Sequence, residues 1–294
     1  MRSTIKVSLA LALTLFLTLL TPTSAALAAG GKRPGYITGT ATTECGKPLA
    51  SFEVGAYGFD GQPNVYVAGL PPVGQAVGHH GLYALRTVDS IHHTKPVDAL
   101  VRGVEAQAPI HYQGHLYQIS LYPTDGKPDG VGPQDFSGHS GKGIIRNFVL
   151  RTSGLKPGQG RLKNDKVELD GADNAAGAFY GGSISLSLSL GTMNTSGASL
   201  DVSLRPTGTL VDGCPARPVT YPIKLGPNAG NSSIDVHDIP LAFYTLSVAL
   251  IGTQSRPLTL QVYGRPANGT NIPLQFLPSH DFPGGDEPLV VMAS

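Results

Sequence analysis

Apolar and polar residues alternate along several short segments of the chain. The clearest segment is residues 183–190, where Ile and Leu alternate with Ser without a break. The same period of two recurs at residues 200–204, 244–250 and 258–262. Alternation of this kind places one set of side chains on each face of a β-strand. The pattern therefore predicts strands with one face on a core and the other in water.

Shorter runs of the same kind occur earlier, at residues 52–56 and 117–121, and residues 144–151 are a further strand candidate. Gly, Pro, Asn and Asp stand between the runs, and these residues fix or permit the backbone dihedrals of turns. No long stretch has the helical period of 3.6 residues. Many short strands separated by turns are typical of sandwiches and barrels. We therefore predict an all-β protein.

One segment breaks the strand pattern. Residues 153–178 are rich in Gly, Lys, Asp, Asn and Ala and show little apolar periodicity. Such composition is typical of a linker or of a long excursion between two domains. We expect one β-sandwich over residues 32–152, a linker over 153–178, and a second β-sandwich over 179–294.

The first 28 residues are predicted to be a signal peptide. Arg2 and Lys6 precede an almost wholly apolar run at residues 7–20, and small residues typical of cleavage sites follow. The alternative is an N-terminal anchor helix, although the run is short for a membrane span. No later run approaches the length of a transmembrane helix. We expect a secreted, periplasmic or cell-surface protein that does not span a membrane after cleavage.

Charge is scarce and balanced. The chain has 21 Lys and Arg residues against 20 Asp and Glu residues, a formal net charge of +1. Without Arg2 and Lys6, 19 basic residues remain beside the 20 acidic ones. Such a chain has no basic excess to neutralise a phosphate backbone, so we expect no nucleic-acid partner.

Five segments resemble one known family. Residues 39–56 read as a strand, a tight turn and a second strand, and a Gly-x-Tyr-x-Leu segment follows at residues 81–85. Residues 146–154, together with residues 204–213 and 238–246, are similar to strands in a secreted branch of the same group. The family is the carboxypeptidase regulatory-like domain of secreted bacterial proteins, a transthyretin-like sandwich. The resemblance implies two prealbumin-like or Ig-like β-sandwiches in tandem after the signal peptide.

The chain has two cysteines, Cys45 and Cys214, one in each predicted domain. An exported protein folds in an oxidising compartment, so a disulfide between them is a candidate. The alternative is two separate, half-buried thiols. There is no Cys-x-x-Cys redox unit.

Histidines are concentrated in the first domain, which holds seven of the nine. Imidazole is a ligand for zinc and copper, and three or four converging rings form a site. His111 and His115 have an even separation, so we expect them to share a strand face. With one ring from each adjacent His pair, the candidate metal ligands are His80, His93, His111 and His115. The alternatives are histidines in polar loops and a surface whose charge changes near neutral pH.

A second candidate cation site is the Gly- and Pro-rich loop that holds Asp125, Asp129 and Asp135. Carboxylates are ligands for calcium, but this spacing matches no EF-hand loop. No segment matches a nucleophile elbow or a phosphate-binding loop. We therefore assign no catalytic residue and no cofactor-binding residue.

These observations favour a secreted, non-enzymatic β-sandwich module that binds or scaffolds at the cell envelope. Its expected partner is an envelope protein or glycan, bound through end loops or strand edges. The alternative is a His-rich metal-binding protein or metalloenzyme outside the cytoplasm, with zinc or copper as the cofactor. A further alternative is a structural subunit that polymerises by strand pairing.

Overall fold

A computed structural model describes residues 31–58, 75–87, 100–127, 136–156, 161–163, 166–168, 178–252, 255–263, 268–278 and 289–294. These residues form strands with short 3-10 turns such as η2 (Ser140–Lys142) and η4 (Ala229–Asn231), which confirms the predicted all-β class. No helix within these ranges is long and apolar enough to cross a bilayer. The predicted signal peptide, His93, Asp129 and Asp135 lie outside the described residues.

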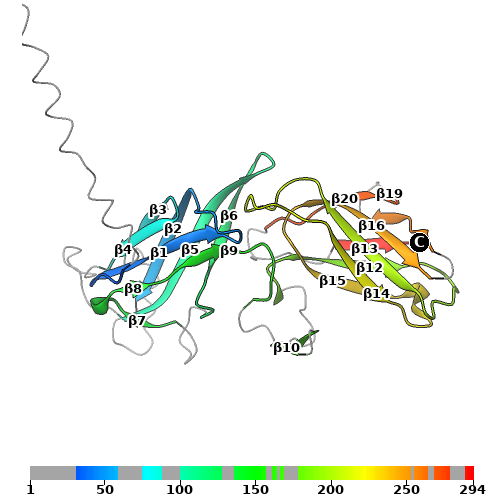
Figure 1. The fold of residues 1–294 in the computed structure, drawn as a ribbon, viewed down its shortest axis with the longest axis horizontal. Coiled ribbons are helices and arrows are strands. Elements are labelled where there is room, and N and C mark those ends of the chain that lie inside the picture. Colours follow the sequence, from blue (N-terminus) through cyan, green and yellow to red (C-terminus); the bar gives the residue numbers. More distant parts are fainter. Residues whose placement is uncertain are drawn as a thin grey trace, which may run out of the picture.

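The first part of the chain forms a closed, barrel-like ring of seven strands (Figure 1). The hydrogen-bonded order is β2–β3–β4–β1–β9–β6–β5, and β5 pairs back with β2. Closure leaves those seven strands without a free edge, a feature that the sandwich prediction for residues 32–152 did not include. The strands are β1 (Tyr36–Thr43), β2 (Ser51–Gly58), β3 (Gln75–His79), β4 (Leu82–Arg86), β5 (Leu100–Tyr112), β6 (His115–Pro123) and β9 (Phe148–Leu150).

Two short strands attach to the ring. β7 (Gly138–His139) pairs with β5, and β8 (Ile144–Ile145) pairs in parallel with β1. The predicted strand over residues 144–151 is thus divided into β8 and β9 by Arg146 and Asn147. Asn147 explains the break, because its Oδ1 accepts hydrogen bonds from the amide and hydroxyl groups of Thr40. This side chain takes the place of a backbone acceptor in the sheet.

Aromatic side chains and close backbone approaches fill the interior of the ring. Tyr83 lies 6.0 Å, ring to ring, from both Phe52 and Phe148, and its hydroxyl donates a hydrogen bond of 2.6 Å to the Arg146 carbonyl. At Gly39 a Cβ atom would stand 1.9 Å from that same carbonyl oxygen. Only glycine therefore allows β1 to run this close to residue 146.

Two hairpins of the ring share one kind of tight turn. His80 and Gly81 connect β3 to β4 with φ values of 52° and 75°. Gln113 and Gly114 connect β5 to β6 with φ values of 49° and 81°. Two consecutive positive φ values are characteristic of the type I′ turn, whose twist matches that of the flanking strands. The chain therefore turns at His80 and Gly81, just before Tyr83.

The second part of the chain forms two five-stranded sheets. One has the order β15–β12–β21–β18–β19, and the other has β14–β13–β16–β17 with β20 also on β16. The predicted alternation holds, since Leu200, Val202 and Leu204 of β13 are buried between partly exposed residues. The strands are β12 (Gly182–Leu188), β13 (Ser199–Pro206), β14 (Val219–Lys224), β15 (Ser233–Ile239), β16 (Phe243–Ile251), β17 (Arg256–Pro257), β18 (Leu260–Val262), β19 (Asn268–Gly269), β20 (Ile272–Gln275) and β21 (Leu289–Ala293).

Two short antiparallel segments, residues 154–156 and 178–180, lie between the ring and the two sheets. We call this pair of segments the neck. Leu155 forms an antiparallel bridge with Phe179. The Lys156 amide donates to the Ala178 carbonyl, and the Tyr180 amide donates to the Gly154 carbonyl, each at 2.8 Å. The two ends of the predicted linker therefore lie side by side. The described residues between these ends form the paired strands β10 (Arg161–Lys163) and β11 (Lys166–Glu168).

Candidate functional site

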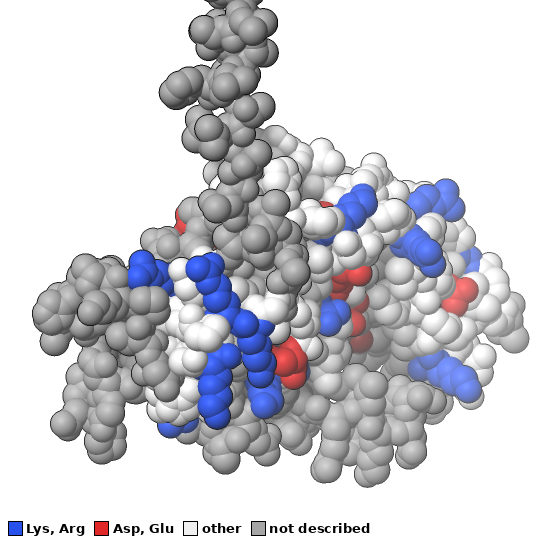
Figure 2. All heavy atoms as spheres, turned by 60° about the vertical axis from the view of Figure 1, so that its left-hand side comes forward, with Lys and Arg blue, Asp and Glu red and all other residues white. Residues whose placement is uncertain are grey.

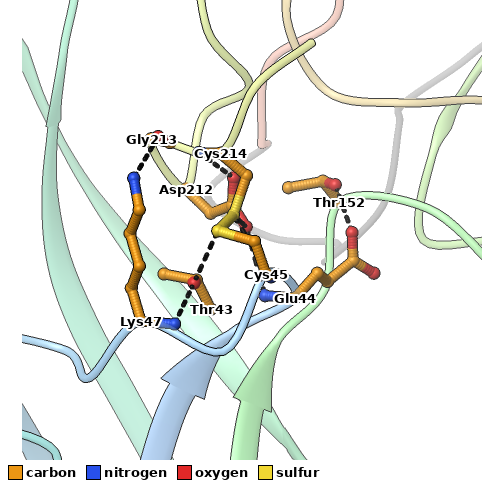
Figure 3. Close-up of a disulfide and its surroundings, with 8 residues drawn as sticks. All are labelled: Thr43, Glu44, Cys45, Lys47, Thr152, Asp212, Gly213 and Cys214. Carbon is orange, nitrogen blue, oxygen red and sulfur yellow. Dashed lines mark hydrogen bonds between the residues drawn. A yellow bond between two sulfur atoms is a disulfide. The ribbon is translucent and has the colours of Figure 1, made fainter. Parts of the chain in front are cut away.

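A disulfide joins the ring to the two sheets beside this neck (Figure 3). Cys45 lies in the turn after β1, and Cys214 lies in the loop after β13, with their Cα atoms 5.9 Å apart. Lys47 reaches from the same turn to the Gly213 carbonyl, at 3.3 Å from its Nζ. We use the name joint for this disulfide together with the residues that connect the two parts around it, which are Glu44, Lys47, Tyr112, Thr152, Gly154, Asp212 and Asp238.

Asp212 organises the C-terminal side of the joint. Its Oδ1 accepts a hydrogen bond of 2.9 Å from the Cys214 amide, two residues along, which fixes the loop that presents the sulfur atom. Its Oδ2 accepts a hydrogen bond of 3.2 Å from the Glu44 amide of the ring. One carboxylate therefore orients both chain segments that carry the cysteines.

Thr152 and Gly154, which follow β9, contact both the ring and the part of the chain that forms the two sheets. The hydroxyl of the buried Thr152 donates to Glu44 Oε2 at 2.6 Å, and its carbonyl accepts the Leu241 amide at 3.0 Å. The Gly154 amide donates to Asp238 Oδ1 at 2.6 Å. Asp238 has a φ of 60°, a left-handed conformation that Asp adopts more readily than most residues. Backbone and side-chain hydrogen bonds therefore reinforce the covalent bond.

The tip of the β5–β6 hairpin supplies a third contact between the two parts. The Tyr112 hydroxyl donates to the Thr209 carbonyl at 2.8 Å and accepts the Phe243 amide at 3.3 Å. The Tyr112 and Phe243 rings pack with their centroids 5.6 Å apart. Nearby, the rings of Tyr122 and Tyr180 are 4.2 Å apart.

Removing the Tyr112 hydroxyl tests how much this contact stabilises the protein. Tyr112→Phe keeps the ring contact but leaves a carbonyl and an amide without their partner, so we expect a loss of about 1–2 kcal/mol in the free energy of unfolding. Urea titration measures it. Tyr117→Phe, on the same hairpin, is the control and should change stability by less. Equal effects of the two substitutions would contradict the role assigned to the Tyr112 hydroxyl.

Two carboxyl groups of the joint, those of Asp212 and Asp238, have raised pKa values. Burial raises the pKa of Asp212 above its usual value of 3.8, although hydrogen bonds from the Cys214 and Glu44 amides oppose the shift. Burial likewise raises the pKa of Asp238, against hydrogen bonds from the Gly154 and Gly181 amides. The charge of Glu44 raises both pKa values further. Negative charge is therefore unfavourable at the joint.

A raised carboxyl pKa predicts a specific pH dependence of stability. Above pH 3.8 the unfolded chain releases protons that the folded Asp238 still holds, so stability falls as the pH rises through the folded pKa. Asp238→Asn keeps an acceptor and tolerates the positive φ, and it removes this titration. We expect the variant to be more stable than the wild type at pH 7, with a difference that narrows toward pH 4.

Urea unfolding across this pH range provides the measurement for the Asp238 prediction. Asp235→Asn, which removes an exposed carboxyl from the same strand, is the matched control. A stability difference for Asp238→Asn that stays constant with pH would contradict the prediction.

His111 and His115, two of the predicted metal ligands, do not share one strand face. His111 pairs with Leu116 across the hairpin, and His115 pairs with Tyr112. Cross-strand partners lie on one face and successive residues on opposite faces, so His111 and His115 lie on opposite faces. The prediction of a shared face was wrong because it treated residues 111–115 as one strand, whereas the chain turns at Gln113 and Gly114.

The remaining predicted ligands are dispersed or undescribed. His80 occupies the first turn position between β3 and β4, and His93 lies outside the described ranges. Within those ranges, no group of three or more His, Cys, Asp or Glu residues is placed to hold a metal ion. The complete four-residue set with zinc or copper stays a prediction, and metal analysis of the mature protein would test it.

Of the three aspartates considered as calcium ligands, the structure describes only Asp125, which lies beside Arg146. Asp125 Oδ2 lies 3.8 Å from Arg146 Nη1. Arg146 also donates a hydrogen bond of 2.8 Å to the Lys127 carbonyl, and its guanidinium carbon stands 3.8 Å from the centre of the Phe136 ring. The buried arginine thus holds both ends of this loop against the ring.

Sequence reasoning paired the correct cysteines as a candidate but missed the groups around them. Asp212 followed by Gly213 is a turn signal that could have been recognised next to Cys214. The partners that Asp212, Tyr112 and Asp238 contact across the joint, namely Glu44, Thr209 and Gly154, lie 84 or more positions away in the sequence. No spacing rule identifies contacts over such separations.

Comparisons with known proteins give no assignment. No family model matches the sequence. No curated protein matches it either. The resemblance to carboxypeptidase regulatory-like domains therefore stays a prediction.

Three solved structures of bacterial proteins are similar over most of the chain. The major pilin protein T-13 of Streptococcus pyogenes is 12% identical, covering 90% of this chain and 97% of that one, with a TM-score of 0.24. The major pilin protein T3.2 of the same species is 10% identical, covering 90% and 99%, with a TM-score of 0.27. A putative cell adhesion protein of Bacteroides ovatus is 10% identical, covering 84% and 98%, with a TM-score of 0.23. Likeness at these TM-scores carries no argument about fold or function.

Proposed function

We propose that the protein is a secreted or envelope-located module that binds or scaffolds and does not catalyse. The observation that carries this proposal is the joint, because a covalent bond there connects two β-sheet parts that are far apart in the sequence. Disulfides persist mainly outside the cytoplasm. The proposed partner is a protein or glycan of the cell envelope, contacted through the loops and the strand edges.

The joint explains why a binding role suits this architecture. Three hydrogen bonds cross it in addition to the disulfide: the Glu44 amide and the Tyr112 hydroxyl donate to the side of the sheets, and the Thr152 carbonyl accepts from that side. Two parts held in one orientation can present their loops to a partner without paying the entropy of orienting two free bodies. A fixed joint is therefore useful to a scaffold even when neither part holds a reactive centre.

Fractionation of the producing cells tests the location. We expect the protein in the medium or the envelope fraction, with its two thiols open to alkylation only after reduction. Cytoplasmic protein with two free thiols would contradict the proposed location.

Sedimentation with washed envelopes tests binding. We expect the mature protein to be retained, and the Cys45→Ser, Cys214→Ser double variant to bind more weakly because its two parts are less firmly oriented. A folded mature protein that stays in the supernatant would overturn the binding role.

A further inference from the structure

The two cysteines of the disulfide stand in different surroundings (Figure 3). Cys45 is exposed, whereas Cys214 is buried, with 3% of its surface accessible. Space is also open beside Cys45, because a Cβ atom placed on Gly46 would meet no atom of the described residues within 4 Å. An external molecule can therefore approach the bond from the side of Cys45, while Cys214 is covered. Figure 2 shows the charged side chains of another face, none of which is needed for this approach.

A neutral donor contacts the sulfur atom of Cys45. The Thr43 hydroxyl lies 3.3 Å from Cys45 Sγ and accepts the Lys47 amide at 3.1 Å. Since the hydroxyl oxygen already accepts, its own proton is available to the sulfur. A hydrogen bond of this kind favours negative charge on Cys45 Sγ when the disulfide is open.

A carboxylate contacts the sulfur atom of Cys214. Asp212 Oδ2 lies 2.9 Å from Cys214 Sγ. The amides of Cys214 and Glu44 donate to the two oxygens of this carboxylate, and such donors favour its ionised form. The Cys45 amide also donates to Cys214 Sγ, at 3.3 Å, but a peptide dipole at the longer distance does not offset a full charge at the shorter one. Burial and the carboxylate together disfavour a thiolate at Cys214.

The other charged groups beside the disulfide are engaged elsewhere. Glu44 Oε2 accepts the Thr152 hydroxyl, and Glu44 Oε1 lies 3.6 Å from Arg151 Nη1. Lys47 Nζ donates to the Gly213 carbonyl. Among the described residues, Asp212 is therefore the charged side chain that contacts a sulfur atom.

We propose that Cys45 is the site at which a low-molecular-weight thiol exchanges with this disulfide, and that the Asp212 carboxylate restrains the exchange. The incoming thiolate attacks Cys45 Sγ and forms a mixed disulfide there. The bond between Cys45 and Cys214 breaks, its electron pair leaves on Cys214 Sγ, and Cys214 then takes a proton from water. A sulfur of higher pKa is a poorer leaving group, so the carboxylate beside Cys214 slows the opening of the bond. Exchange at Cys45 does not depend on the location or the partner proposed above.

Two single-cysteine variants locate the reactive sulfur. Cys214→Ser leaves the Cys45 thiol, and Cys45→Ser leaves the Cys214 thiol. Each variant is mixed with oxidised glutathione, and mass spectrometry follows the adduct. We expect Cys45 to be modified at least about tenfold faster than Cys214, because its thiolate is more accessible and less disfavoured. Equal rates, or faster modification of Cys214, would overturn the assignment of Cys45.

Reduction of the intact disulfide by dithiothreitol at neutral pH tests the role of Asp212. Asp212→Asn removes the charge beside Cys214, and we expect reduction to be at least about tenfold faster than in the wild type. Asp238→Asn is the control for charge, since its carboxylate accepts the Gly154 amide. Thr152→Val is the control for loosening, since it removes a hydrogen bond of the joint. We expect both controls to react within about threefold of the wild type.

Two readouts separate the charge of Asp212 from a structural role. Urea titration confirms that each variant is folded before the rates are compared. In the Cys45→Ser background, Asp212→Asn should lower the pH at which the Cys214 thiol reacts with iodoacetamide, and Thr152→Val should leave it unchanged. An unchanged reduction rate in Asp212→Asn, or an equal acceleration in Thr152→Val, would overturn the role of the carboxylate.

Discussion

The protein without its disulfide is expected to lose about 5 kcal/mol in the free energy of unfolding. Cys45 and Cys214 are 169 positions apart, and a crosslink over so long a span removes much conformational entropy from the unfolded chain. The Cys45→Ser, Cys214→Ser double variant in urea measures the loss. The native hydrogen bonds of Asp212 and Thr152 remain available, so we expect the variant to fold and unfold at lower urea.

Reduction provides the control for this prediction. Complete reduction of the wild type should lower its stability by the same amount, and the same reductant should not affect the double variant. Mass spectrometry confirms the state of the thiols. A wild type that is fully reduced and as stable as before would contradict the prediction.

Arg146→Ala is expected to lower the free energy of unfolding by about 3–5 kcal/mol. The Arg146 side chain has no exposed surface, so truncation leaves a large cavity in the ring. It also removes the cation–π contact with Phe136 and the hydrogen bond to the Lys127 carbonyl. Thermal or urea unfolding measures the change.

Two further variants separate volume from charge at this site. Arg146→Met keeps most of the buried volume, so we expect it to lose less stability than Arg146→Ala. Asp125→Asn should cost less than about 1 kcal/mol, because this carboxylate is 37% exposed and solvent screens the ion pair. A larger loss for Asp125→Asn than for Arg146→Ala would refute the explanation by cavity formation.

Local pattern was enough to predict the strands and several of their turns. The alternation at residues 183–190 corresponds to β12, and the alternation at residues 244–250 lies within β16. Both alternations follow from the burial of one strand face, and this burial can be predicted from residues that are close together in the sequence. The turn at His80 and Gly81 was also foreseeable, since glycine accepts a positive φ without strain.

The joint and the closed ring could not be predicted in the same way. Closure depends on the pairing of β2 with β5, in which Glu53 lies opposite Gln107, and no local pattern specifies this partner. The Gln113–Gly114 turn was missed because Gln seldom adopts a positive φ, and that error placed two histidines on one face. Arg146 was missed because arginine is rarely fully buried.

The two ends of the segment between Leu155 and Phe179 pair directly with each other. The position of these ends therefore does not have to depend on the length of the segment. Leu155 and Phe179 are bridged directly to each other, and loop closure becomes only slowly more costly as a loop grows. We therefore expect a short insertion between Lys156 and Ala178 to leave the Leu155–Phe179 bridge in place. This position is the natural place to insert a reporter domain or an affinity tag.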